Sequence, residues 1–228
     1  MKSLYSLPIL ALIGLLGLAV AQEKKPPSYP VMAPADQYRS PNVQEEIALA
    51  RTAAPSSVSA AAEILVLGKR GYETAVSGSN GFVCFVERSW TAPTDDPGFW
   101  NPKGRAPICL NAAAARTYLP RTIMKTDLIL AGRTKAQMVE AVSAAIDKKE
   151  LPPMELGAMC YMLSKQGYLN DLAGHWHPHL MFFVSKTDPA AWGAGVQGSP
   201  ILALNNKSED LTIFLVPVHE WSDGTADH

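Results

Sequence analysis

The amino-acid sequence predicts an α+β domain with a mostly antiparallel sheet, and three observations support this prediction. Short β-branched and aromatic runs, separated by turn residues, come first, between residues 63 and 88. Segments with helical periodicity follow between residues 111 and 149, and strand-like runs return from residue 158 onward. Strands, then helices, then strands again is the order typical of an α+β fold. We therefore expect an N-terminal meander and C-terminal strands packed with a central helical segment.

The N-terminus has the features of a secretory signal peptide. Lys2 precedes an apolar run over residues 9–20, and residues 19–21 form a small-x-small cleavage site. This run is shorter than the roughly 20 apolar residues that cross a bilayer. We predict a signal peptide over residues 1–21, no transmembrane segment after its cleavage, and a secreted or periplasmic protein.

A proline-rich segment follows the predicted cleavage site. Residues 22–41 contain five prolines and few large apolar side chains. Because such a segment buries little apolar surface, it is typical of a flexible spacer. We therefore expect a single α+β domain over residues 42–228.

The first elements of this domain are a helix and a meander. Asn42 and Glu45 have the spacing of a helix N-cap and its acidic partner, and Pro55 must end that helix. Three strands are expected next, with turn residues between them. They lie at residues 64–67, 72–76 and 82–86. Residues 60–65 are also good helix sequence, so periodicity leaves the first strand open to a helical alternative.

The middle of the chain predicts a long connection followed by helices. The connection covers residues 89–108, and loops of this length usually bind something or lack order. Asn111 caps an alanine-rich helix, which Pro120 should kink or divide. Thr134 and Gln137 have the spacing of a capping box for another helix. The remaining strands are expected at residues 158–164, 180–185, 201–204 and 211–218.

The three cysteines predict one disulfide in an oxidising compartment. Cys84 lies in a predicted strand and Cys109 directly follows the long connection, so we pair these two. The bridge would stabilise the fold by roughly 3.5 kcal/mol on the chain-entropy model. Cys160, between apolar neighbours, is then a buried free thiol. No nucleophile signature surrounds it.

The histidines are the densest group of possible metal ligands. His175, His177 and His179 alternate along the chain, which would place three imidazoles on one face of a strand. Residues i and i+4 of a straight strand are about 13 Å apart. Two adjacent histidines could therefore share a divalent ion such as zinc, whereas all three would need a bend at Pro178. The alternative is a surface turn leading into a buried strand.

Charge and motifs exclude several other functions. The net charge of −1 lacks the basic surface typical of a nucleic-acid binder. The chain has no P-loop and no dinucleotide-binding fingerprint. Its Gly-Ser turns lack the strand-to-helix elbow of a nucleophilic serine.

Four segments carry a resemblance to known sequences. They are residues 78–84, Cys109, residues 161–164 and residues 178–183. In these segments the chain resembles uncharacterised exported bacterial proteins. The resemblance implies an exported location, supports the pairing of Cys84 with Cys109, and implies no catalytic residues.

Two functional hypotheses follow. The leading one is a non-catalytic domain that binds a small molecule or an envelope component through residues 89–108 and 166–178. Trp90, Trp100 and Trp176 are expected to be exposed in these loops. The alternative is a metal-dependent hydrolase that uses the three histidines as ligands and Glu220 or an aspartate as base. The sequence does not decide whether the protein is an enzyme, and no cofactor is predicted beyond the possible metal.

Overall fold

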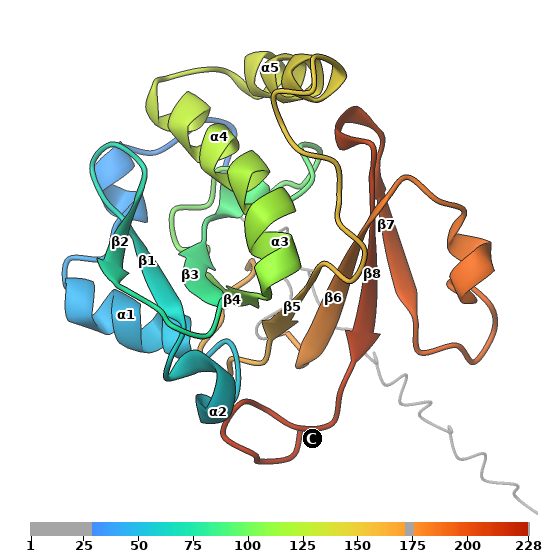
Figure 1. Ribbon diagram of the computed structural model, residues 1–228. Coiled ribbons are helices and arrows are strands. Elements are labelled where there is room, and N and C mark those ends of the chain that lie inside the picture. The colour runs from blue at the N-terminus through green and yellow to red at the C-terminus, as the bar shows by residue number, and fades with distance from the viewer. Residues whose placement is uncertain (1–28, 172–175, 228) are drawn as a thin grey trace, which may run out of the picture.

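One sheet organises the computed structural model, which describes residues 29–171 and 176–227. Its strands are β1 (Glu63–Leu67), β2 (Tyr72–Val76), β3 (Val83–Glu87), β4 (Ala106–Leu110), β5 (Met159–Met162), β6 (His179–Ser185), β7 (Leu202–Asn206) and β8 (Leu211–Pro217). They form an eight-stranded sheet in the order β2-β1-β3-β4-β5-β6-β8-β7 (Figure 1). The predicted α+β class with a mostly antiparallel sheet is therefore confirmed. The predicted signal peptide lies outside the described residues.

Helices cover both faces of one half of the sheet. The α-helices are α1 (Val43–Arg51), α2 (Ser56–Ser59), α3 (Ala112–Thr117), α4 (Leu119–Leu130) and α5 (Lys135–Asp147). The short 3-10 helices are η1 (Ala35–Tyr38), η2 (Ser89–Thr91), η3 (Pro189–Trp192) and η4 (Lys207–Glu209). Helices α3 and α4 lie over one face of the sheet and α1 over the other, while β8 and β7 extend beyond these helices (Figure 1). No helix in the described ranges is long and apolar enough to span a membrane.

The predicted meander is wrong at its third strand. Strands β1 and β2 form the expected antiparallel hairpin, but β3 lies on the other side of β1 and runs parallel to it. All five residues of β3 are buried, whereas the middle of β2 is exposed. A strand buried on both faces belongs inside a sheet, so β2 is left at the edge. The connection crosses close to β1 at Gly78, where an added Cβ atom would lie 2.1 Å from the backbone nitrogen of Glu63.

The predicted helix signals are confirmed. The Asn42 side chain accepts a hydrogen bond from the Gln44 amide, and Thr134 and Gln137 form a reciprocal capping box. Pro120 lies in the first turn of α4, so it divides the alanine-rich segment into α3 and α4. The alternative of a helix at residues 60–65 is resolved, because α2 ends at Ser59 and β1 begins at Glu63.

The boundary predicted at residue 42 is wrong, because packing begins earlier in the chain. Tyr38 of η1 is fully buried and its ring packs 4.8 Å from that of Trp90. Its hydroxyl donates to the carbonyl of Trp100 at 2.7 Å. The prediction relied on the proline content of the segment. Burial of the single aromatic residue Tyr38 is sufficient to hold the end of this segment against the core. The end of the predicted spacer is therefore part of the core.

The cysteines lie on opposite faces of the sheet. Cys84 and Cys109 face each other across β3 and β4 and form the predicted disulfide. Both pack against α1, together with Ala50 and Ala53. Cys160 of β5 is free and fully buried on the other face, in the cluster beneath α3 and α4. Burial raises the pKa of its thiol well above the usual value, so the thiol remains protonated.

Candidate binding surface

The two loops predicted to bind a ligand do come together. Residues 89–105 and 166–171 meet at Arg105 and Tyr168, whose backbones exchange two hydrogen bonds of 2.8 and 2.7 Å. The side-chain amide of Asn101 donates to Asp171 at 3.3 Å. These hydrogen bonds join residues 89–105 directly to residues 166–171.

Asp171 is the centre of this loop junction. Its carboxylate accepts hydrogen bonds from the hydroxyls of Tyr29 and Tyr168, and Lys103 lies 3.8 Å away. The hydrogen bonds from Tyr168 and Tyr29 lower the pKa of Asp171. The hydrogen bond between Tyr29 and Asp171 raises the pKa of Tyr29 to about 12. The phenols therefore stay protonated as donors, and the cluster joins the N-terminal segment to both loops.

The three tryptophans expected to be exposed are buried. Trp90 is fully buried and donates its indole N–H to Thr126 at 3.1 Å. Trp176 donates to the carbonyl of Ser164 at the same distance. Trp100 packs edge-on against Phe99 in the cluster that contains Tyr38. Tryptophan combines a large apolar surface with one hydrogen-bond donor, so a buried tryptophan can anchor a long loop to the core.

The predicted metal ligands are only partly described. His175 lies outside the described residues. His177 shares a 2.6 Å hydrogen bond with Asp227 through Nδ1, and His179 Nδ1 contacts the carbonyl of His177 at 2.8 Å. Burial lowers the pKa of His179. In the part of the chain that the structure covers, no three His, Cys, Asp or Glu residues are grouped closely enough to hold a metal ion.

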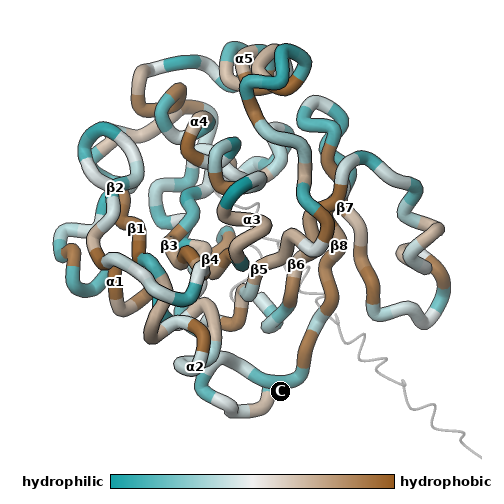
Figure 2. The backbone as a smooth tube through the Cα atoms, in the orientation of Figure 1, coloured by the Kyte–Doolittle hydropathy of each residue, from teal (hydrophilic) through white to brown (hydrophobic). Residues whose placement is uncertain are grey.

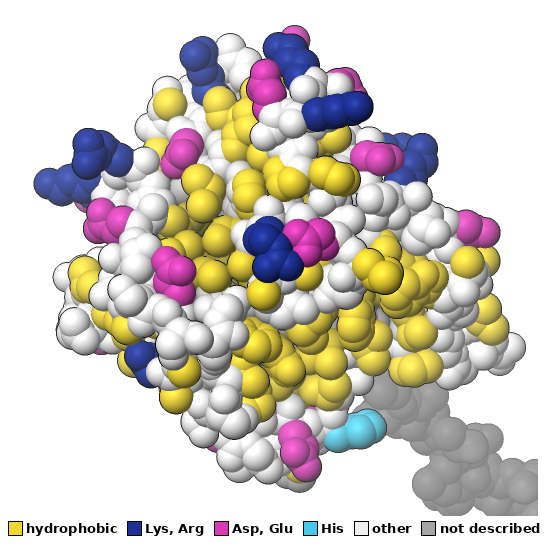
Figure 3. Space-filling view, in the orientation of Figure 1, with side chains coloured by type: hydrophobic (Ala, Val, Ile, Leu, Met, Phe, Trp, Pro, Cys, Tyr) yellow, Lys and Arg dark blue, Asp and Glu magenta, His cyan; other side chains and the backbone are white. Residues whose placement is uncertain are grey.

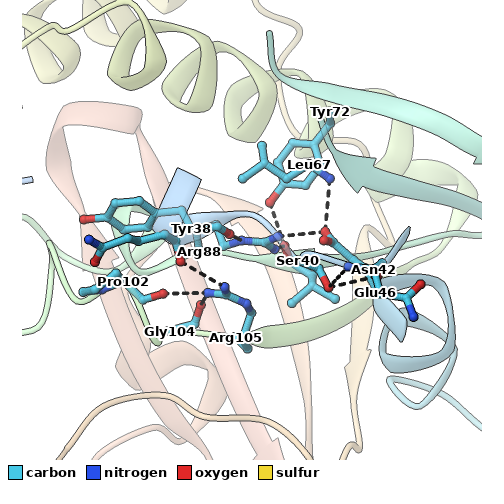
Figure 4. Close-up of polar contacts among 12 residues, drawn as sticks. Tyr38, Ser40, Asn42, Glu46, Leu67, Tyr72, Arg88, Pro102, Gly104 and Arg105 are labelled. Carbon is cyan, nitrogen blue, oxygen red and sulfur yellow. Dashed lines mark hydrogen bonds and ion pairs between the residues drawn. The ribbon is translucent and has the colours of Figure 1, made fainter. Parts of the chain in front are cut away.

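A buried ion pair that the sequence analysis missed lies beneath α1. Arg88 and Glu46 are 2.8 Å apart, and their side chains are 0% and 4% exposed. Arg88 also donates to the carbonyls of Tyr38 and Val86, and Glu46 accepts from the backbone amide of Leu67 (Figure 4). The pair therefore fixes α1, β1 and the N-terminal segment to β3.

A second buried network lies on the opposite face. Lys125 of α4 forms an ion pair with Glu209 of η4, and both side chains are at most 10% exposed. Glu87 of β3 accepts a 3.3 Å hydrogen bond from the hydroxyl of Tyr118. Burial raises the pKa of Glu87 to about 7, and the charge of Lys125 opposes this shift. This network connects α4 to the turn between β7 and β8. Its members come from distant parts of the chain, so no spacing pattern could have revealed it.

The groove beside α5 is open to solvent rather than enclosed. One of about 710 Å³ lies between α5 and η4. Its lining residues are Thr94, Lys135, Ala136, Val139, Glu140, Ser143, Ala144, Asp147 and Ser208. Pockets for small molecules usually bury about 70–90% of the ligand surface. An open groove does not provide that burial.

Exposed apolar side chains gather instead at the β7 end of the sheet. Leu202 and Leu204 of β7 are 58% and 49% exposed. The register places them beside Leu215 and Ile213 of β8, on the same face as α3 and α4. Figure 3 shows hydrophobic side chains over this part of the sheet. The leucines thus extend an apolar surface to the edge of the sheet.

The two edges of the sheet differ in charge. The β2 edge carries Glu73, and the turn before it contains Lys69 and Arg70. Strand β7 has no ionisable residue, and Figure 2 shows hydrophobic residues along β7 and β8. Natural sheets commonly place charges at an edge to prevent pairing with another chain. By this criterion β2 is protected and β7 is open.

The back of the same strands is covered. Trp192 of η3 stacks on Phe214 of β8, with ring centroids 4.2 Å apart and planes inclined by 8°. The connection between β6 and β7 therefore packs on the face opposite Leu202 and Leu204. The front face and the outer edge of β7 form the candidate binding surface.

No known protein family matches the chain. Comparisons with curated proteins and with solved structures likewise found no significant similarity.

Proposed function

We propose that this protein is an exported, non-catalytic binding domain, and that its partner is a polypeptide strand that pairs with β7. The observation that carries the proposal is the uncharged β7 edge with two half-exposed leucines. An added strand would pair with the outward-pointing backbone groups of β7 and place its own side chains beside both leucines. This is recognition by strand addition, in which main-chain hydrogen bonds supply affinity and alternate side chains supply specificity.

Export is supported by the sequence at the N-terminus and by the disulfide. Cys84 and Cys109 form a buried bridge across β3 and β4. Stable disulfides of this kind are typical of secreted and periplasmic proteins. The signal-peptide pattern of residues 1–21 agrees with that location.

A binding role is favoured over catalysis by the state of the polar side chains. Glu46, Arg88, Lys125 and Glu209 are buried in ion pairs between elements, where they hold the fold together. Asp171 accepts hydrogen bonds from two tyrosines, and His177 is bonded to Asp227. Exposed apolar surface, in contrast, typically marks an interaction site. The partner that this surface favours is a protein, because an uncharged strand edge with two exposed leucines can pair with another polypeptide strand.

Photo-crosslinking in the cells that produce the protein tests this proposal. A photo-reactive amino acid is placed at position 204 of β7, or at position 73 of the β2 edge as the matched control. We expect a covalent adduct from position 204 and none from position 73. The additional substitution Leu202→Lys should abolish the adduct, because it places a charge on the contact face. Failure to form an adduct at position 204 would contradict the proposal.

A further inference from the structure

We propose that the strand that pairs with β7 is β7 of a second copy of this chain, in an antiparallel arrangement centred on Ala203. This inference rests on the proposed function and names its partner. The dimer would join two eight-stranded sheets into one continuous sheet across a two-fold axis. The interface would use the same residues of both copies, as in most homodimers.

Symmetry restricts the register of such a pair. Directly opposed residues in an antiparallel ladder project from the same face of the sheet. Side chains alternate between the two faces, and a two-fold axis normal to the sheet keeps each side chain on its own face. Opposed residues are therefore an even number of positions apart in the sequence, and one residue of the strand must lie opposite the same residue of the other copy. With Ala203 at the axis, Leu202 lies opposite Leu204 of the partner subunit, and Leu204 lies opposite the partner's Leu202. With Leu204 at the axis, Leu202 would lie opposite the polar Asn206 of the partner subunit.

The Ala203 register gathers the exposed apolar groups of both copies. Four leucines would form one row on the face that carries α3 and α4. Ile213 and Leu215 of each copy flank this row through the existing pairing of β7 with β8. On the other face the residue at the axis is alanine, which is small enough to face its own copy. The two exposed leucines of each protomer thereby pack beside leucines of the other copy, which reduces the apolar surface that they expose.

Charge also permits this pairing. Strand β7 contains no ionisable residue, and Lys207 would lie opposite Ser199 of the partner subunit. Like charges therefore do not oppose each other along the paired strands. At the β2 edge, pairing centred on Glu73 is disfavoured, because it would place two carboxylates opposite each other. The pairing of β2 with β1 is also irregular, because its register shifts between Ile64 and Leu65 of β1.

The expected dimer is weak and reversible. Stable specific interfaces bury about 1,200–2,000 Å² in total, and weak, transient ones bury less. Pairing over the five residues of β7 belongs with the weak interfaces. We therefore expect a dissociation constant on the order of micromolar. Measurements must extend well above that concentration.

Sedimentation equilibrium of the purified mature protein, up to several hundred micromolar, tests the dimer. We expect reversible dimers, and we expect the double variant Leu202→Lys/Leu204→Lys to weaken them by at least about 100-fold, because four lysines would replace the leucine row. Val31→Lys is the matched control, since Val31 is 72% exposed and lies outside β7. Circular dichroism establishes that each variant is folded.

Disulfide trapping tests the register. Ala203→Cys should form an intermolecular disulfide, because directly opposed residues have the Cα separation of about 4.4–6.8 Å that a disulfide requires. Asn205→Cys should not, because two copies of residue 205 would be separated by about 13 Å along the ladder. Trapping at position 205 but not at position 203 would overturn the register.

The outcomes for the dimer and for the proposed function are separable. A protein that stays monomeric at the highest concentration, while position 204 still crosslinks to a different protein, overturns the dimer and leaves the proposed function standing. If the protein is monomeric and position 204 forms no adduct, both are overturned. Dimers that persist in the double lysine variant also overturn this interface.

Discussion

Removal of the Glu46 carboxylate should strongly destabilise the fold. In the variant Glu46→Ala the Arg88 guanidinium stays buried without its counter-charge, and the amide of Leu67 loses its acceptor. Breaking one side of a buried ion pair typically costs about 3–5 kcal/mol. We expect a loss of about 4 kcal/mol, which corresponds to a decrease in melting temperature of about 8–16 °C for a domain of this size.

Urea unfolding at pH 7, followed by circular dichroism, measures this loss. The matched control is Glu45→Ala, because Glu45 is the exposed neighbour on the same helix and bonds only the Asn42 cap. It should cost less than about 1 kcal/mol. The double variant Glu46→Leu/Arg88→Met should be more stable than Glu46→Ala, since it removes the isolated charge. A loss below about 1 kcal/mol in Glu46→Ala would refute the role assigned to the pair.

Three more predictions concern the cysteines, one buried acid and the histidines. Peptide mapping under non-reducing conditions should find Cys84 linked to Cys109, with Cys160 alkylated only after unfolding; a bridge that includes Cys160 would contradict the fold. Reduction of the bridge should lower stability by roughly 3.5 kcal/mol on the chain-entropy model. Because the pKa of Glu87 is raised to about 7 in the folded state, the folded protein binds the extra proton between pH 4.5 and 7, so stability from this group should fall as pH rises through that window. Glu87→Gln should remove this fall and stabilise the protein at pH 8 by about 3 kcal/mol relative to the wild type; an unchanged pH profile would contradict the raised pKa. Elemental analysis of protein purified without chelator should find less than stoichiometric zinc, iron, copper and manganese, and one metal per chain would favour the hydrolase alternative.

Local patterns in the sequence were sufficient for much of the fold. The capping box at Thr134 and the break at Pro120 depend on neighbouring residues, and the disulfide between Cys84 and Cys109 was predicted from the places of these cysteines along the chain. The capping and proline signals act within one or two turns of chain, so they can be recognised without tertiary information. The disulfide joins residues 25 apart in the sequence, and its prediction began from the number of cysteines. Fold class followed from the order in which these elements occur.

Features that depend on distant contacts could not be predicted. The parallel pairing of β3 with β1 is decided by which strand is buried on both faces, and periodicity does not report that. Burial of Trp90 likewise depends on Tyr38 and Thr126, far away in the sequence. An open edge strand cannot be recognised from the sequence either. The leucines of β7 alternate along the chain as they would in a strand whose leucines face the core.

The position of Cys160 has a consequence for oxidative folding. A thiol attacks a disulfide only if the sulfur atoms can meet, and thiol–disulfide exchange proceeds through the thiolate. Once β3, β4 and β5 are paired, the sheet itself separates Cys160 from the bridge, and burial keeps its thiol protonated. Exchange among the three cysteines is thus confined to chains whose sheet has not yet formed. The folded sheet therefore preserves the Cys84–Cys109 pairing by keeping the third thiol away from the bridge.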